Sequence, residues 1–131
     1  MLPSAIEAWF DARGWRPAAF QLETAEAFTA GRSGLLHAPT GSGKTVAALL
    51  GPLSKALKEG QAGGRIQILW VTPLRALATD TTNAIRTMVA ELLPDWQVMK
   101  RSADTSASER QKIRRRLPEV LVTTPESLSL L

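Results

Sequence analysis

The stretch APTGSGKT, residues 38 to 45, contains the residue types that bind nucleotide phosphates. Gly41 and Gly43 allow backbone N–H groups to turn toward a phosphate, and a helix that begins near Gly43 would add the positive end of its dipole. Lys44 offers a mobile positive charge to the β- and γ-phosphates, and the Thr45 hydroxyl is suited to bind Mg²⁺ held by the nucleotide. The predicted phosphate-binding residues are Thr40, Gly41, Ser42, Gly43, Lys44 and Thr45.

The loop departs from the general pattern, Gly-x-x-x-x-Gly-Lys-Ser/Thr, because Ala38 stands at the first position. The alternative is an ordinary Gly/Ser turn that ends in Lys-Thr by chance. A phosphate loop is favoured because the apolar run Gly34–Ala38 predicts a buried strand before it, and the residues after it predict a helix. The loop alone does not identify the reaction, since kinases, GTPases, transporters and motor proteins share it.

The elements that must position this loop alternate between helix and strand. Helices are predicted over 4–13, 20–30, 43–58, 75–93, 106–116 and 125–131, and strands over 34–38, 65–73, 96–99 and 119–123. Ser4 and Glu7 form a capping-box pattern, and Pro52 should kink its helix or end it early. The strands are continuous apolar runs rather than alternating ones, which predicts a parallel sheet covered on both faces.

The composition is that of a soluble globular domain. Of 131 residues, 44% are hydrophobic and 21% are charged, and this length supports one core. The net charge of +4 permits an anionic partner but is weak evidence for one. The absence of Cys excludes disulfides and thiolate metal sites, and the single His37 cannot form a metal cluster alone. No run approaches the ~20 apolar residues of a spanning helix, so we expect no membrane partner and a cytoplasmic location.

Five stretches, taken together, resemble the motifs of superfamily-two helicases in order and approximate spacing. They are GWRPAAFQLET, LLHAPTGSGKT, LWVTPLRALATD, RSADTSASERQ and LVTTPESLSLL. More narrowly, they resemble the large helicase-related group and the ligase-associated DEXH-box helicases of bacteria. The resemblance implies an α/β fold, a P-loop NTPase (RecA-like) parallel sheet flanked by helices and incomplete at its C-terminal end. It divides the amino-terminal part of a helicase ATP-binding domain, 1–131, into a helical lead-in with an adenine-reading segment, 1–33, and a P-loop α/β core, 34–131.

The resemblance also implies that ATP, with Mg²⁺, is the bound nucleotide. In such helicases a Gln ahead of the phosphate loop contacts the adenine edge through its amide, and the matching residue is Gln21, with Arg16 nearby. A carboxamide offers one acceptor and two donor hydrogens, which suits adenine. The alternative for Gln21 is an exposed residue on a helix face.

Two further motifs of the family hold the backbone of a nucleic-acid strand, with RSADTS as a third candidate. The implied contacts are Thr72, Pro73, Leu74, Arg75, Arg101, Thr105, Thr123, Thr124 and Pro125. The partner would be single-stranded DNA, with RNA or a hybrid duplex as alternatives.

At position 103 the family usually has Gly. If that Gly lets the backbone approach a phosphate or adopt positive φ, Ala103 would cost about 1 kcal/mol and weaken the contact with the strand. The basic run ERQKIRRR, 109–116, favours a solvated helix face over a nucleic-acid patch.

The sequence lacks the Asp-Glu-x-His pattern on which ATP hydrolysis by this family depends. It also lacks room for a second motor domain with its arginine finger. The resemblance implies part of an ATP-dependent DNA helicase that translocates 3′ to 5′ on single-stranded DNA and unwinds duplexes in DNA repair. Because these parts are missing, we expect this portion to be inactive alone. Its partners would be the rest of the helicase chain and repair proteins such as a ligase. One alternative is a non-catalytic nucleotide- or nucleic-acid-binding module. Another is a P-loop kinase or transporter ATPase, but this second alternative leaves the motifs VTPLRAL and TTPESL unexplained.

Overall fold

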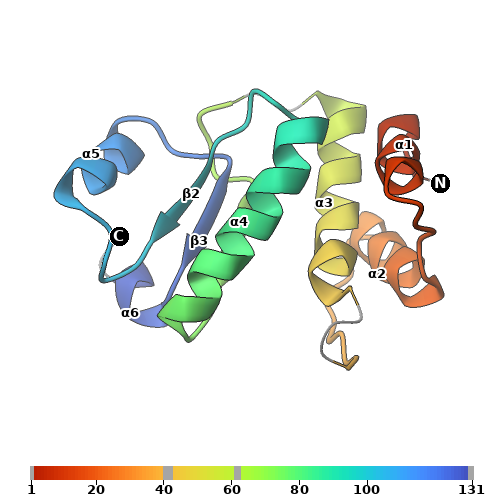
Figure 1. The fold of residues 1–131 in the computed structure, drawn as a ribbon, viewed down its shortest axis with the longest axis horizontal. Coiled ribbons are helices and arrows are strands. Elements are labelled where there is room, and N and C mark those ends of the chain that lie inside the picture. Colours follow the sequence, from red (N-terminus) through yellow and green to blue (C-terminus); the bar gives the residue numbers. More distant parts are fainter. Residues whose placement is uncertain (1, 40–42, 61–62, 130–131) are drawn as a thin grey trace. The chain divides into compact units, whose positions relative to one another are not determined.

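The computed structural model describes residues 2–39, 43–60 and 63–129. In chain order its elements are α1 (Ser4–Ala12), α2 (Ala19–Thr29), α3 (Lys44–Glu59), β1 (Ile68–Val71), α4 (Arg75–Leu92), β2 (Val98–Arg101), α5 (Ala107–Arg115), β3 (Val120–Thr123) and α6 (Pro125–Leu128). Two compact units make up the chain, Met1–Gln61 with α1 to α3 and Ala62–Leu131 with the sheet and α4 to α6 (Figure 1). This division falls after residue 61, whereas the predicted lead-in ends at residue 33.

In the first unit, α2 packs closely against α3. A Cβ added at Gly51 would lie 2.7 Å from the Cβ of Phe28, so the two helices approach at a position that only glycine allows. The predicted early end at Pro52 is wrong, because α3 runs through it to Glu59. Leu49, Leu50 and Leu53 are fully buried there. Burying three leucines contributes about 4–9 kcal/mol, which outweighs the ~3 kcal/mol cost of an interior proline.

Two other local predictions for this unit are wrong. The N-cap of α1 is Pro3, with φ −57° and ψ 149°, and no side chain caps the helix. The fixed φ of proline ends the extended entry one residue early, so Ser4 is already helical and cannot form the capping box. Residues 34–38 are not a strand, and Leu35 is 94% exposed. No described strand pairs with this segment, and a lone extended segment has no ladder to stabilise it.

The second unit is built on a three-stranded parallel sheet of order β1-β3-β2, which confirms the predicted α/β class. The register places Val120 of the central strand between Ile68 and Val98. Helix α4 packs against β2 and β3 (Figure 1). All of β3 is buried, as its continuous apolar run predicts. In β1 the burial alternates, with Leu69 48% exposed, so the prediction of two covered faces is wrong for this edge strand.

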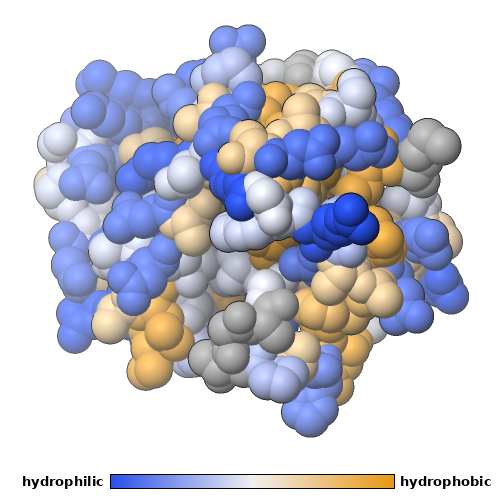
Figure 2. Space-filling view, turned by 45° about the vertical axis from the view of Figure 1, so that its right-hand side comes forward, coloured by the Kyte–Doolittle hydropathy of each residue, from blue (hydrophilic) through white to orange (hydrophobic). Residues whose placement is uncertain are grey.

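Side chains protect the free edge of β2 from further pairing. The Val98 carbonyl accepts a hydrogen bond from Arg86 Nη2 at 2.8 Å, and the Lys100 carbonyl accepts one from Thr105 Oγ1 at 3.2 Å. Both bonds occupy acceptors that another strand would need. Elsewhere, apolar side chains lie in patches between charged ones on the face drawn in Figure 2. The described residues include no helix that could span a membrane.

A buried carboxylate holds together the amino-terminal ends of the strands. The side chain of Glu119 is fully buried and accepts hydrogen bonds from Gly64 N at 2.7 Å, Gln97 N at 2.7 Å and Arg116 Nη2 at 2.9 Å. These partners lie before β1, before β2 and just after α5. Burial raises the pKa of Glu119, but the backbone N–H bonds and the Arg116 bond outweigh it, and the pKa falls below its ordinary value.

Replacing Glu119 by Gln should lower the free energy of unfolding by about 1–3 kcal/mol near neutral pH, because buried donors lose a charged acceptor. The folded pKa is depressed, so the stabilisation by the carboxylate is complete above the ordinary value of 4.5 and is lost as the pH falls through the folded value. Urea unfolding of Glu119→Gln and the unaltered protein should therefore give curves that converge in acid. Glu23→Gln, on an exposed site of α2, should show no such difference. A stability gap of equal size in acid would contradict the assignment.

Candidate functional site

The described part of the phosphate loop is the start of helix α3. Gly43 is the N-cap, in the left-handed conformation with φ 91° and ψ 29°. Lys44 and Thr45 occupy the first turn and are partly exposed. The 16-residue helix directs its unpaired N–H groups and positive dipole end to this place. The predicted Thr40, Gly41 and Ser42 lie outside the described residues.

Gln21 is fixed against this helix start. Its Nε2 donates to the Gly43 carbonyl at 3.1 Å, and its Oε1 accepts from Ala18 N at 2.8 Å. The residue is 7% exposed, so the alternative interpretation as an exposed residue on a helix face is wrong. One N–H and one acceptor lone pair of the amide remain for another partner. The predicted contact with adenine stays a prediction, and so does that of Arg16, which is exposed.

In the second unit, three predicted strand-binding segments meet at the carboxyl ends of the strands. They line a pocket of about 380 Å³. Its residues are Pro73, Leu74, Arg75, Ala103, Thr124, Glu126 and Ser127. The position follows from the parallel sheet, because the carboxyl ends of all three strands lie at the same edge. The tertiary structure thus places together segments that lie far apart in the sequence.

Four predicted contact residues are instead used inside the unit. Thr123 is buried and its Oγ1 donates to the Arg101 carbonyl at 2.8 Å, while Arg101 is itself 5% exposed. Thr105 closes a turn, accepting from Ser102 N at 2.8 Å and donating to Lys100. The backbone N–H of Thr72, also buried, donates to the Thr123 carbonyl at 2.9 Å. The side chains of Thr105 and Thr123 thus bond to the backbone of the sheet edge, and the contacts of all four residues with nucleic acid stay predictions.

Of the other predicted contacts, Pro73, Leu74, Arg75 and Thr124 line the pocket, and Pro125 follows Thr124 at the start of α6. Pro73, Leu74 and Pro125 are exposed. Thr124 caps α6, where its Oγ1 accepts from Ser127 N at 3.4 Å, and its hydroxyl hydrogen remains to be donated. Ala103 lines the same pocket, and no described residue other than glycine has positive φ. Ala103 therefore carries no strain from positive φ, and the effect of its Cβ on the approach of a phosphate stays a prediction.

Sequence reasoning missed an ion pair at this pocket. Arg75 Nη1 lies 2.8 Å from Asp104 Oδ1, and the two side chains are 63% and 52% exposed. Residues 29 positions apart give no sequence signal for such a contact.

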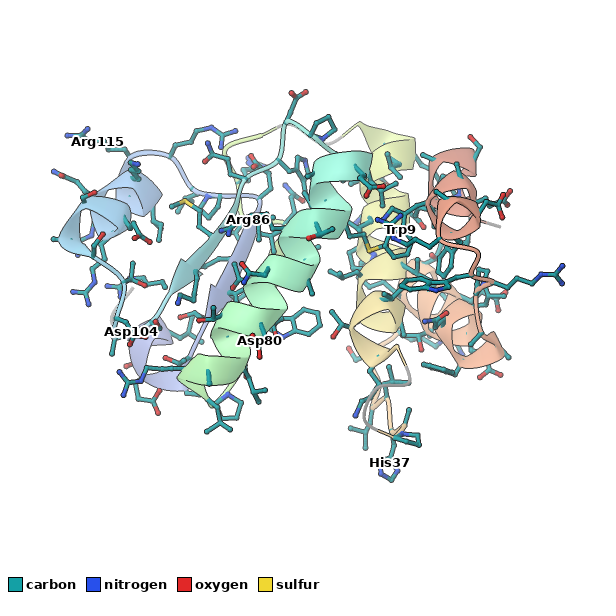
Figure 3. The ribbon with its side chains drawn as sticks, in the orientation of Figure 1. Trp9, His37, Asp80, Arg86, Asp104 and Arg115 are labelled. Atoms are coloured by element: carbon teal, nitrogen blue, oxygen red, sulfur yellow. The ribbon has the colours of Figure 1, made fainter. Side chains whose placement is uncertain are left out.

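The basic run on α5 lies elsewhere. Arg115 projects from the end of the unit opposite to Asp104 (Figure 3). With Lys112, Arg116, Arg86 and Trp96 it borders a separate hollow of about 570 Å³. These residues of the run therefore lie apart from the predicted strand-binding edge, whereas Arg110, earlier in α5, donates from Nη2 to the carbonyl of Ala103 at 3.4 Å. The described residues contain no group of His, Cys, Asp and Glu that could hold a metal ion.

Comparison with known proteins gives consistent results. Residues 18–131 match the profile of the DEAD/DEAH box helicases. The chain is 37% identical to ATP-dependent helicase Lhr-Core protein 2 of Thermococcus barophilus, over 76% of the chain and 13% of the relative. It is 35% identical to the Lhr helicase/uracil glycosylase of Escherichia coli, over 97% of the chain and 9% of the relative.

A solved structure supports the same relationship. The helicase Lhr of Mycobacterium smegmatis, bound to ssDNA and AMP-PNP, matches with a TM-score of 0.86 and 33% identity. The match covers 98% of this chain and 18% of that one. The resemblance to the large helicase-related group is confirmed, and the chain spans only a small part of the length of these relatives.

Gly43→Ala should lower the free energy of unfolding by about 1–3 kcal/mol. The new Cβ would lie 2.6 Å from Gln21 Nε2, and φ is 91°. Chemical denaturation of Gly43→Ala, Gln21→Ala and the double variant separates the two causes, because Gln21→Ala relieves the clash and the double variant should lose less than the sum. Gly34→Ala is the control, since its Cβ would meet nothing within 4 Å. Strict additivity would show that the two residues do not touch.

Proposed function

Because the chain belongs to the DEAD/DEAH box helicase family, we propose that it forms the ATP-binding part of the first motor domain of a DNA helicase. The observation that carries this proposal is the pocket at the carboxyl edge of the sheet. Three segments converge there, including the first turn of the 18-residue helix α4 and the exposed Arg75. Unpaired N–H groups of a helix start, a guanidinium and the Thr124 hydroxyl are the donors that a phosphodiester backbone accepts.

Single-stranded DNA is the proposed nucleic acid. The Mycobacterium relative, with ssDNA bound, supports DNA over the alternatives of RNA or a hybrid duplex. The proposed contacts are Pro73, Leu74, Arg75 and Thr124, with Pro125 at the start of α6. Because these groups contact the backbone and no base, binding should be independent of sequence. It should also weaken as salt is added.

ATP is the proposed nucleotide, supported by the AMP-PNP in that relative. Lys44 and Thr45 stand in the first turn of α3, where a phosphate meets the positive helix end. The Thr45 hydroxyl is suited to bind a Mg²⁺ ion that is held mainly by the phosphates. When bound, this ion would neutralise part of the negative charge of the phosphates. Gln21, already bonded to Gly43, would direct its remaining amide groups toward adenine.

The chain supplies binding groups but no Asp-Glu-x-His motif. We propose that carboxylates and an arginine finger from the rest of the helicase chain complete the hydrolytic site, and that this portion is inactive alone. On the family resemblance we propose translocation from 3′ to 5′, duplex unwinding in DNA repair and a ligase as partner. A cytoplasmic location is proposed from the sequence, which has no apolar run long enough to span a membrane. Unwinding assays of the full-length helicase on duplexes with a 3′ or a 5′ single-stranded tail would test the direction, and unwinding only from the 5′ tail would contradict it.

Lys44→Ala should abolish ATP binding, with a loss of affinity of about 100-fold or more, because the helix start loses its positive side chain. Titration with a fluorescent ATP analogue measures the change. Lys55→Ala, further along α3, removes the same charge and should leave the affinity unchanged. Unchanged affinity of Lys44→Ala would refute the phosphate-loop assignment.

Arg75→Ala should weaken binding to single-stranded DNA by about three- to tenfold at low salt and reduce the salt slope by about 1, because one phosphate contact is lost. Fluorescence anisotropy with a labelled oligothymidine at several salt concentrations gives both quantities. Arg114→Ala, on an exposed part of α5, is the matched control. Equal losses in both variants would mean that net charge, rather than this edge, governs binding.

A further inference from the structure

The Arg75–Asp104 ion pair joins two segments of the proposed strand-binding edge. Arg75 is the first residue of α4, and Asp104 lies in the turn between β2 and α5. Their closest atoms are 2.8 Å apart, and both side chains are more than half exposed. Exposed ion pairs contribute little to stability, so this contact can exchange at little cost.

Asp104 lies where a phosphate would also be favoured. A cation in the first turn of a helix faces the positive end of the dipole, which is unfavourable, whereas an anion there is stabilised. The Asp104 carboxylate bonds to the guanidinium of Arg75, and Arg75 is the first residue of α4, at the positive end of the helix. These are the features that would attract a phosphodiester.

Other groups at the pocket do not replace this contact. Glu126 also lines the pocket and adds a second negative charge. Thr124 and Ser127 are tied to each other across the N-cap of α6. Among the described residues that line this pocket, Arg75 has the only positively charged side chain. Its charge is paired with the carboxylate of Asp104.

We propose that Asp104 is an internal competitor of the nucleic-acid backbone for Arg75. This inference rests on the proposed function of the edge. Phosphate docking is an exchange in which Arg75 leaves the Asp104 carboxylate for a phosphate oxygen, and release of the strand restores the ion pair. The exchange lowers affinity and gives Arg75 a partner when a phosphate departs. A strand that must move along the edge requires such reversible contacts.

The test is a double-mutant cycle in the full-length protein, read out by anisotropy with labelled oligothymidine. Asp104→Asn keeps the side-chain shape and removes the charge. It should tighten binding about two- to fivefold at low salt, which is the range expected for an exposed ion pair. The gain should shrink as salt rises, because added ions screen the carboxylate. In the Arg75→Ala background the same substitution should change affinity by less than about 1.5-fold.

Asp95→Asn is the matched control. It changes the net charge equally, but Asp95 is an exposed residue between α4 and β2, at the amino end of the sheet. A gain as large for Asp95→Asn, or one that persists without Arg75, would overturn the proposal in favour of a general charge effect. Weaker binding by Asp104→Asn would overturn it by making Asp104 a positioning residue for Arg75.

Failure of the proposed function has a different result. In that case the unaltered protein would not bind the oligonucleotide in a salt-dependent manner, or Arg75→Ala would leave binding unchanged. Circular dichroism and thermal unfolding of each variant establish that it is folded. Because the ion pair is exposed, neither substitution should shift the unfolding midpoint strongly.

Discussion

The sheet unit depends on one buried carboxylate. Glu119 accepts hydrogen bonds through its side chain from Gly64, Gln97 and Arg116, and its own carbonyl accepts from Gln67 and Ile68. Each segment that leads into a strand is thereby fixed to the same residue. A buried charge is tolerated only when it is well bonded, and here every donor comes from a segment whose position must be set. The register of β1 and β2 against β3 follows from this arrangement.

The two ends of the sheet consequently differ in character. At the amino end the polar groups are paired with one another around Glu119. At the carboxyl end the buried threonines bond to the backbone and shape the edge, while Arg75 and Asp104 remain exposed. Such an edge can exchange partners because its charges are held by a contact that solvent already weakens. The structural end and the proposed binding end are thus separated by the length of the strands.

Much of the architecture was predictable from local pattern. Helix α4 begins at the predicted residue, and β3 is buried throughout, because long periodic segments and continuous apolar runs are strong signals. The predictions of local structure were wrong at positions where tertiary packing and strand pairing, rather than the local sequence, determine the conformation. Pro52 did not interrupt α3 because buried leucines stabilise that stretch, and residues 34–38 form no strand because no described strand pairs with them. The alternation of burial in β1 reflects its edge position, which no run of residues reveals.

The sequence by itself determined the kinds of chemistry: a Gly-Lys-Thr helix start for phosphate, a Gln ahead of it, and polar residues after successive strands. These follow from residue type and short-range spacing, on which backbone conformation depends directly. Only the tertiary structure decided which groups are available. It fixed the Gln21 amide on Gly43, turned Thr105 and Thr123 inward, and paired Arg75 with Asp104. Those contacts join residues far apart in the chain, and they form because parallel strands bring the segments after them to a common edge.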